Sequence, residues 1–190
     1  MKHYETILGK MKLPDNDERI LPGDDRIAEA KYIYTQATII EAPPTIVWRY
    51  LMQLGCDRAG WYSIDLLDHG GVPSINHLVE GWETRTPGDK VSATPARDSF
   101  FNVYEAEKEK NFIIGGEGTR LGGDFKMSWA FVLDQIGEDA TLLSARVRMK
   151  AAPKWSEWLQ GNLLAPPMHG LMQHVQLKTI KRMVERDAEM

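Results

Sequence analysis

The 190-residue sequence has a single cysteine and no long apolar run. One thiol, Cys56, excludes an internal disulfide and any zinc site built on cysteines. No apolar segment approaches the ~20 residues that a helix needs to cross a bilayer, so we expect no membrane span. The first twelve residues also lack the continuous apolar core of a signal peptide. These features favour a cytoplasmic protein.

An excess of positive charge is missing as well. The 23 Lys and Arg are outnumbered by 27 Asp and Glu, which gives a net charge of −4. Lys178, Lys181 and Arg182 gather near the C-terminus, but acidic residues interleave with them, as on a solvated helix face. Proteins that bind nucleic acid through the phosphate backbone usually carry a basic patch. We therefore expect no nucleic-acid partner.

The motifs of metal and cofactor sites are absent from the sequence. No phosphate-binding glycine motif, HExxH-type motif or nucleophile elbow occurs. His169 and His174 stand five residues apart, which turns them ~140° from each other on a helix, so they cannot face one metal ion. The prediction is a protein without metal or cofactor.

What is present is the composition of one globular domain. Hydrophobic residues make up 43% and charged residues 26% of the chain. A chain of this size buries roughly 70% of its unfolded surface, enough to fold without a metal or disulfide. We predict an N-terminal arm over residues 1–30 and a single domain over residues 31–190.

The first part of that domain is predicted to be a strand followed by two short helices. Residues 31–40 are rich in β-branched and aromatic side chains, which favours a strand. Two prolines then precede an apolar helical pattern over 46–54, and Gly55 is a natural stop. Residues 59–69 are predicted to form the second helix.

The second part is predicted to be five antiparallel strands and one long helix. The strands are expected over 90–94, 100–106, 111–115, 126–133 and 141–150. Glycine clusters at 115–118 and 122–123 are interpreted as hairpin loops. In the last strand, Leu143 and its alternate neighbours are expected to face the core, and Ser144, Arg146 and theirs to face water. An amphipathic helix follows over 168–186.

This order of elements indicates an α+β fold. Strands in a run followed by a helix favour a curved antiparallel β-sheet that grips the long C-terminal α-helix. Such a curve leaves an internal cavity wherever side chains are too few to fill it.

Three stretches resemble the START-like (SRPBCC) helix-grip superfamily, which includes Bet v 1-like proteins, polyketide cyclases and lipid-transport domains. They are the strand and helix opening at 38–48, the strand Ser128–Leu133 and the strand 141–147 that precedes the gripping helix. Residues 58–65 and 21–25 resemble a bacterial branch of it. The resemblance covers about residues 20–186. It implies the helix-grip fold and a cavity for a hydrophobic small molecule.

The sharpest polar signal lies in the predicted second helix. Arg58, Tyr62 and Asp65 would share one helical face, and Asp65 stands four residues before His69. In the functional interpretation these four are catalytic: Arg58 orients an anionic or carbonyl group, Tyr62 donates a hydrogen bond, and Asp65 with His69 moves a proton. In the structural interpretation they are an Arg–Asp pair with aromatic packing.

Aromatic and methionine side chains are expected to line the cavity, because such walls adapt to varied apolar ligands. The alternative is that many of them only fill the core. The candidate ligand-binding residues are Trp61, Trp82, Phe100, Tyr104, Trp129, Phe131, Met168, His169 and Met172.

Three functions remain open at this point. The first is binding or transport of a hydrophobic or amphipathic small molecule, lipid- or polyketide-like. The second is a cofactor-free enzyme of the cyclase, aromatase or hydratase kind acting in the same cavity. The third is an interaction module or homodimer, in which the N-terminal arm or the segment with Trp155 and Trp158, which stand about one turn apart, mediates self-association.

Overall fold

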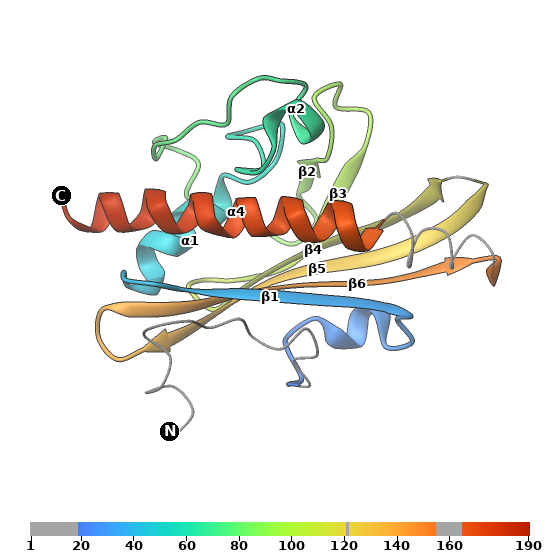
Figure 1. Ribbon diagram of the computed structural model, residues 1–190, viewed down its shortest axis with the longest axis horizontal. Helices are drawn as coiled ribbons and strands as arrows, with labels where there is room; N and C mark the ends of the chain where they lie inside the picture. Colours follow the sequence, from blue (N-terminus) through green and yellow to red (C-terminus); the bar gives the residue numbers. More distant parts are fainter. Residues whose placement is uncertain (1–18, 121, 155–164) are drawn as a thin grey trace.

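The computed structural model describes residues 19–120, 122–154 and 165–190 (Figure 1). The elements follow one another as η1 (Asp24–Ile27), β1 (Tyr32–Ile40), α1 (Pro44–Met52), α2 (Asp65–Asp68), β2 (Lys90–Ser92), β3 (Phe100–Glu107), β4 (Asn111–Arg120), β5 (Gly123–Ile136), β6 (Ala140–Ala152) and α4 (Ala165–Ala188).

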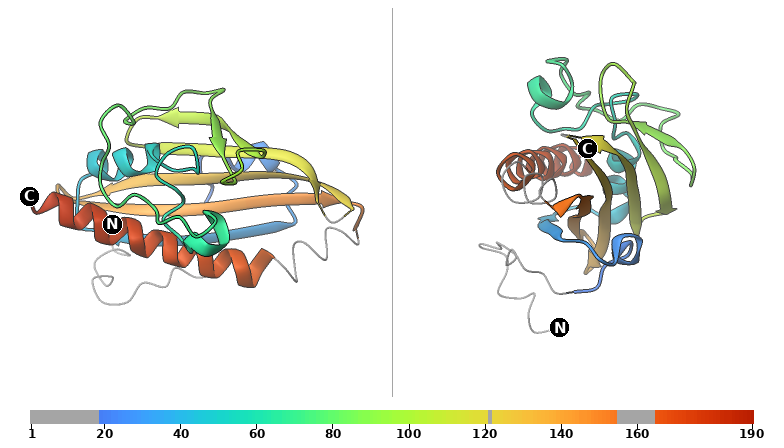
Figure 2. Two further views of the ribbon diagram at one scale, coloured as in Figure 1. Left: turned by 90° about the horizontal axis from the view of Figure 1, so that it is seen from above. Right: turned by 90° about the vertical axis from the view of Figure 1, so that its right-hand side faces the viewer.

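The six strands form one antiparallel sheet in the order β1-β6-β5-β4-β3-β2. The end-on view in Figure 2 shows α4 on one face of this curved sheet and η1 on the opposite face. The predicted fold class, a curved antiparallel sheet that grips a C-terminal helix, is thereby confirmed.

The inner face of α4 changes character along the helix. Its C-terminal half buries apolar side chains, among them Ile180, Met183 and Val184. Its N-terminal half instead buries the polar Gln173 and Gln176, each 1% exposed. Leu171, an apolar residue of this half, is 55% exposed and faces away from the sheet. The core is therefore apolar at one end of the helix and polar at the other.

The helix predicted over residues 59–69 is wrong in its first half. Only Asp65–Asp68 is helical, and the preceding residues form a tight loop. Gly55 and Gly60 exchange two backbone hydrogen bonds of 3.0 and 2.9 Å. Gly60 (φ 88°) and Tyr62 (φ 58°) both adopt left-handed backbone conformations, which a right-handed helix cannot contain.

The glycine cluster at 115–118 is not a hairpin loop, because β4 continues through it to Arg120. A Cβ atom on Gly115 would lie 2.3 Å from the carbonyl oxygen of Met127 and 2.5 Å from the ring of Tyr104. The residue is glycine because the neighbouring strand and an aromatic ring come too close for any side chain.

The outer face of β6 does not meet water as predicted. Ser144 and Arg146 are 0% and 3% exposed, because residues 19–30 lie across this face. Asp24 forms an ion pair of 2.7 Å with Arg146, whose Nε also donates to Thr35 (2.8 Å). Leu21 closes a second small apolar cluster there. The sheet is thus covered on both faces.

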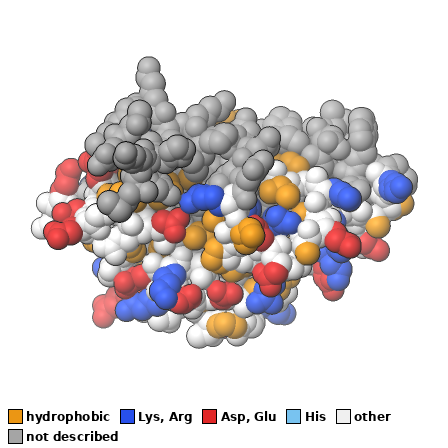
Figure 3. Space-filling view, turned by 90° about the horizontal axis from the view of Figure 1, so that it is seen from below, with side chains coloured by type: hydrophobic (Ala, Val, Ile, Leu, Met, Phe, Trp, Pro, Cys, Tyr) orange, Lys and Arg blue, Asp and Glu red, His pale blue; other side chains and the backbone are white. Residues whose placement is uncertain are grey.

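The surface seen from below carries acidic and basic side chains in a mixed pattern (Figure 3). Within the described ranges, no helix is both long and apolar enough to pass through a membrane.

Candidate functional site

A cavity of about 340 Å³ lies between the start of α4, the α2 region and the inner face of β5. Twelve residues line it: Trp61, Ser63, Leu67, Asp68, Ala93, Phe101, Met127, Trp129, His169, Met172, Gln173 and Gln176. We call it the helix–sheet cavity. It coincides with the polar half of α4, where the helix presents amides and an imidazole instead of aliphatic side chains.

One side of the cavity is an aromatic wall, made of Trp61, Phe101, Trp129 and His169. The rings of Trp61 and Trp129 stack with centroids 5.4 Å apart and planes 16° apart. Phe101 meets Trp61 edge-on at 5.7 Å, and His169 meets Trp129 edge-on at 5.4 Å. The wall joins a loop, two strands and α4, so it exists only in the folded protein.

Hydrogen bonds hold the polar face of α4 in place. His169 Nε2 lies 2.9 Å from Gln173 Oε1, and Gln173 Nε2 donates to the carbonyl oxygen of Ala145 at 3.0 Å. Gln176 Nε2 donates to the carbonyl oxygen of Trp61 at 2.9 Å. Burial lowers the pKa of His169, which is therefore a neutral imidazole at pH 7.

Three lining residues have buried polar atoms that no described residue satisfies. They are the indole Nε1 of Trp129, a donor, and the Oε1 of Gln176 and the carboxylate oxygens of Asp68, which are acceptors. Buried polar groups are almost always hydrogen-bonded in proteins, because leaving one unpaired costs about 1–3 kcal/mol. These three belong to residues of one cavity lining, where a ligand or water can pair with all of them, whereas the other unsatisfied atoms, on Asp24, Tyr32, Gln36, His69 and Asn111, lie elsewhere.

Asp68 is the acidic residue of this site. Burial, and then the charge of Asp65, raise the pKa of its carboxyl group to about 6. The Ser63 hydroxyl donates a hydrogen bond to the carbonyl oxygen of Met172 at 2.9 Å, and when it turns toward Asp68 it favours the ionised carboxylate and lowers this pKa. The carboxyl group of Asp68 thus changes charge within the range of pH in which most proteins work.

The four residues predicted to be catalytic are not among those that line the cavity. Arg58 donates to the carbonyl oxygens of three residues in the α1 and 82–84 region. Tyr62 is 1% exposed, with its hydroxyl 3.2 Å from the side-chain nitrogen of Gln53. Asp65 accepts from Ser74 Oγ at 2.6 Å.

His69 is buried beside Gly60, where a Cβ would lie 2.8 Å from its Nδ1. Because residues 58–63 form a loop, the shared helical face expected for Arg58, Tyr62 and Asp65 does not exist. Their catalytic role stays a prediction.

The predicted ligand-binding residues divide between the cavity and other parts of the fold. Trp61, Trp129, His169 and Met172 line the cavity. Phe131 and Trp82 pack in the main core instead. The side chain of Met168 lies outside the described residues.

Phe100 and Tyr104 lie away from the cavity. Phe100 is 39% exposed, with the ammonium group of Lys90 5.3 Å from its ring centroid. Tyr104 packs on the outer face near Leu21. The neighbour of Phe100, Phe101, is the one that faces inward. Alternation along the strand from the core residue Val103 is the sequence signal that would have identified it.

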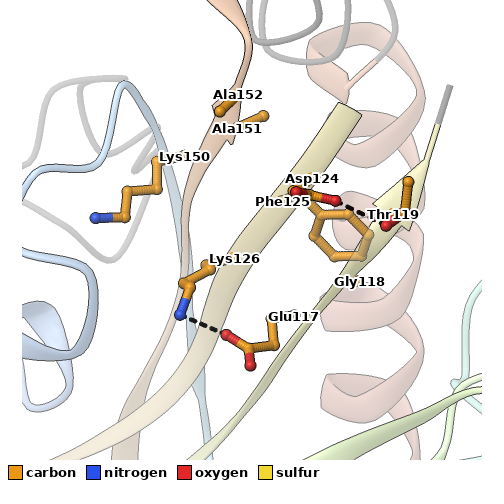
Figure 4. Close-up of a pocket in the computed structure, with 9 residues that line it drawn as sticks. All are labelled: Glu117, Gly118, Thr119, Asp124, Phe125, Lys126, Lys150, Ala151 and Ala152. Atoms are coloured by element: carbon orange, nitrogen blue, oxygen red, sulfur yellow. Dashed lines mark hydrogen bonds and ion pairs between the residues drawn. The ribbon is translucent and has the colours of Figure 1, made fainter. Parts of the chain in front are cut away.

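A larger hollow of about 640 Å³ lies at the far end of the sheet, at the tips of β4, β5 and β6 (Figure 4). Its charged groups already have partners: Lys126 pairs with Glu117, and Thr119 donates to Asp124 at 2.7 Å. Lys150 points away from both pairs. Among the described residues that line the hollow there is one aromatic side chain, Phe125, and no unpaired buried group, so the smaller helix–sheet cavity is the better candidate site.

The described residues contain no group of three or more His, Cys, Asp or Glu side chains that could hold a metal ion. The described lining of the helix–sheet cavity offers one titrating carboxyl group, a neutral imidazole, a hydroxyl group, amides and aromatic faces.

No protein-family model and no curated protein matches the sequence. Among solved structures, the chain is similar to a protein of Nitrosomonas europaea, with 14% identity and a TM-score of 0.51 over 85% of this chain and 99% of that chain. It is also similar to norcoclaurine synthase from Thalictrum flavum, with 10% identity and a TM-score of 0.47 over 87% and 94% of the two chains. At these identities the likeness concerns the fold alone. With six antiparallel strands curved around its C-terminal helix, the chain has the helix-grip fold that the sequence resemblance implied.

Proposed function

We propose that this protein binds or carries a compact amphipathic molecule with an aromatic body in the helix–sheet cavity. One observation carries the proposal: the aromatic wall and three unsatisfied buried polar groups belong to the lining of the same cavity. An apolar wall provides affinity by excluding water, and a few polar atoms fix the orientation of the ligand. Tight folding alone does not require polar atoms left without partners.

The volume of the cavity limits the size of the ligand. Small-molecule sites usually span about 300–1,000 Å³, so 340 Å³ is near the lower end. Ring contacts cover one side of it, and flat rings pack well against other rings. Both features favour a compact ring system of the polyketide-like kind over a long acyl chain.

Substituting tryptophan at either of two adjacent positions on α4 tests the proposal. Met172 lines the cavity, whereas Leu171 is 55% exposed. Met172→Trp places an indole in the space that the ligand would occupy, and Leu171→Trp places it in solvent. We expect Met172→Trp to weaken binding of 1-naphthylmethanol about tenfold or more, as measured by titration calorimetry, because overpacking a filled site costs about 1–3 kcal/mol.

The Leu171→Trp protein is the control and should bind like the wild type. Thermal unfolding followed by circular dichroism establishes that both variants are folded. Equal binding by both variants, or no binding by the wild-type protein, would contradict the proposal.

A cofactor-free enzyme of the cyclase or dehydratase kind is the second candidate, and Asp68 is the observation that favours it. General acid–base groups work best when their pKa lies near the operating pH, and that of Asp68 is about 6. For an enzyme, the Asp68→Asn protein purified from cells should retain a different small molecule, the unreacted substrate, from the one found with the wild type by native mass spectrometry. The same molecule in both proteins would argue for a carrier.

The third hypothesis, self-association, depends on Trp155 and Trp158. Both lie outside the described residues, so a homodimer stays a prediction from the sequence.

A further inference from the structure

The described lining of the helix–sheet cavity contains a negative charge without a matching positive group. None of its twelve lining residues is Lys or Arg, and its one histidine, His169, is kept neutral by burial. Asp68 is the only carboxyl group among them. An ionised carboxylate accepts hydrogen bonds and donates none, and its oxygens have no partner in the part of the chain that the structure describes.

A second acceptor faces the same space. Gln176 is 1% exposed, and its amide nitrogen is already used by the carbonyl oxygen of Trp61. Its Oε1 has no partner among the described residues. The amide orientation is therefore fixed with the oxygen left over. Two unsatisfied acceptors call for a ligand group that is rich in donors.

The aromatic wall adds a further preference. The faces of Trp and Phe rings carry partial negative charge, which attracts cations within about 6 Å of the ring centre. An ammonium group carries three N–H donors and a positive charge. It therefore meets the demands of the carboxylate, the amide oxygen and the ring faces with one chemical group.

From these features, and resting on the proposed function, we propose that Asp68 anchors the ligand, and that the ligand carries a protonated amine attached to its aromatic body. The unsatisfied indole N–H of Trp129 then meets an acceptor, such as a hydroxyl or carbonyl oxygen, elsewhere on the ligand.

The groups around Asp68 determine whether its carboxyl group is ionised. Asp65 favours the protonated form of Asp68, whereas a hydrogen bond from Ser63 and the charge of His69 favour the ionised form. The thiol of Cys56 donates to the backbone carbonyl of Asp68 at 3.2 Å, and burial raises its pKa to about 11, so it is uncharged. His169 on α4 is neutral. Amine binding should therefore weaken as the pH falls through about 6 and Asp68 is protonated.

Three probes with one ring system separate the contributions of charge and shape: 1-naphthylmethylamine, 1-naphthylmethanol and 1-naphthoate. At pH 7.5 we expect the wild-type protein to bind the amine about tenfold or more tighter than the alcohol, since a hydrogen bond to a charged group contributes about 1.5–3 kcal/mol. Naphthoate should bind weakest. Titration calorimetry measures all three affinities.

Asp68→Asn should bring the affinities for the amine and the alcohol together, because it weakens binding of the amine far more than binding of the alcohol. Asp65→Asn is the matched control, because Asp65 lies on the same short helix but pairs with Ser74 and is not among the lining residues. It should keep the preference for the amine.

The outcomes of these titrations distinguish a failure of the proposed Asp68 anchor from a failure of the proposed ligand-binding function. Equal binding of the amine and the alcohol by the wild type, or a preference that survives Asp68→Asn, would overturn the anchor while leaving a ligand-binding cavity. Failure of all three probes to bind would overturn both.

Discussion

At the scale of single residues, two half-buried carboxyl groups of this protein lie in different surroundings. Asp24 is paired with Arg146 at 2.7 Å, whereas the oxygens of Asp68 have no partner among the described residues. Burying a charge without a partner is costly, so such a group shifts its pKa toward the neutral form. Asp68 follows this rule, with its pKa raised to about 6.

The raised pKa of Asp68 predicts how its substitution changes stability with pH. The folded protein binds the proton more tightly than the unfolded chain, whose aspartates titrate near 3.9. Above about pH 6, the ionised Asp68 therefore destabilises the fold, and this penalty disappears as the pH falls from 6 to 4.

Asp68→Asn removes that penalty. We expect the variant to be more stable than the wild type at pH 8, by on the order of 1 kcal/mol after allowance for solvent screening, and equally stable at pH 4. Urea unfolding at both pH values measures the difference. Asp139→Asn, in the exposed β5–β6 turn, controls for the loss of one charge. A variant that is less stable at pH 8 would show that the carboxylate has a partner.

At the scale of elements, α4 divides the interior into a packed end and a hollow end. Toward its C-terminus, Leu177, Ile180 and Val184 recur at helical spacing and fill the core. Toward its N-terminus the same spacing brings His169, Gln173 and Gln176 to the inner face. One helix thereby serves both stability and the site.

The identity of single residues in β4 and β5 likewise shapes the sheet beside the cavity. Trp129 and Met127 point inward from β5 into the cavity, while Ser128 between them faces outward and is 2% exposed. Gly115 lets β4 pass closely beside β5. A larger residue there would push the strands apart and displace the aromatic wall.

At the scale of the whole molecule, residues 19–30 cover the outer face of the sheet opposite α4. The pair between Asp24 and Arg146 connects this segment to β6, with both side chains largely buried. Removing one partner of a buried ion pair leaves a charge without compensation, which costs about 3–5 kcal/mol.

We therefore expect Asp24→Ala to lower the free energy of unfolding by about 3 kcal/mol in urea titrations, the lower end of this range because Arg146 also donates to Thr35. Asp25→Ala is the matched control, since Asp25 is the next residue in η1 and is exposed. It should change the stability by less than about 0.5 kcal/mol. A loss of stability for Asp24→Ala no larger than that for Asp25→Ala would mean that the ion pair contributes little to the fold.

The amino-acid sequence by itself determined the order of strands and helices, the grip of the sheet on α4 and the aromatic and methionine character of the cavity. These properties follow from the spacing of apolar residues, which neighbouring positions decide. Prediction from the sequence was wrong over residues 58–63, where paired glycines override an apparently helical pattern. It was also wrong over 115–118, where glycine permits close packing instead of a turn.

Only the tertiary structure decided which side chains meet in the cavity. Phe101 faces it in place of Phe100 because of strand alternation, and Tyr104 lies on the opposite face. The role of Asp68 depends on Trp129, His169 and Gln176 approaching it from β5 and α4, at least sixty residues away along the chain. Burial and the absence of a partner are properties of that assembly, and they set the charge of the carboxyl group and the kind of ligand that the site favours.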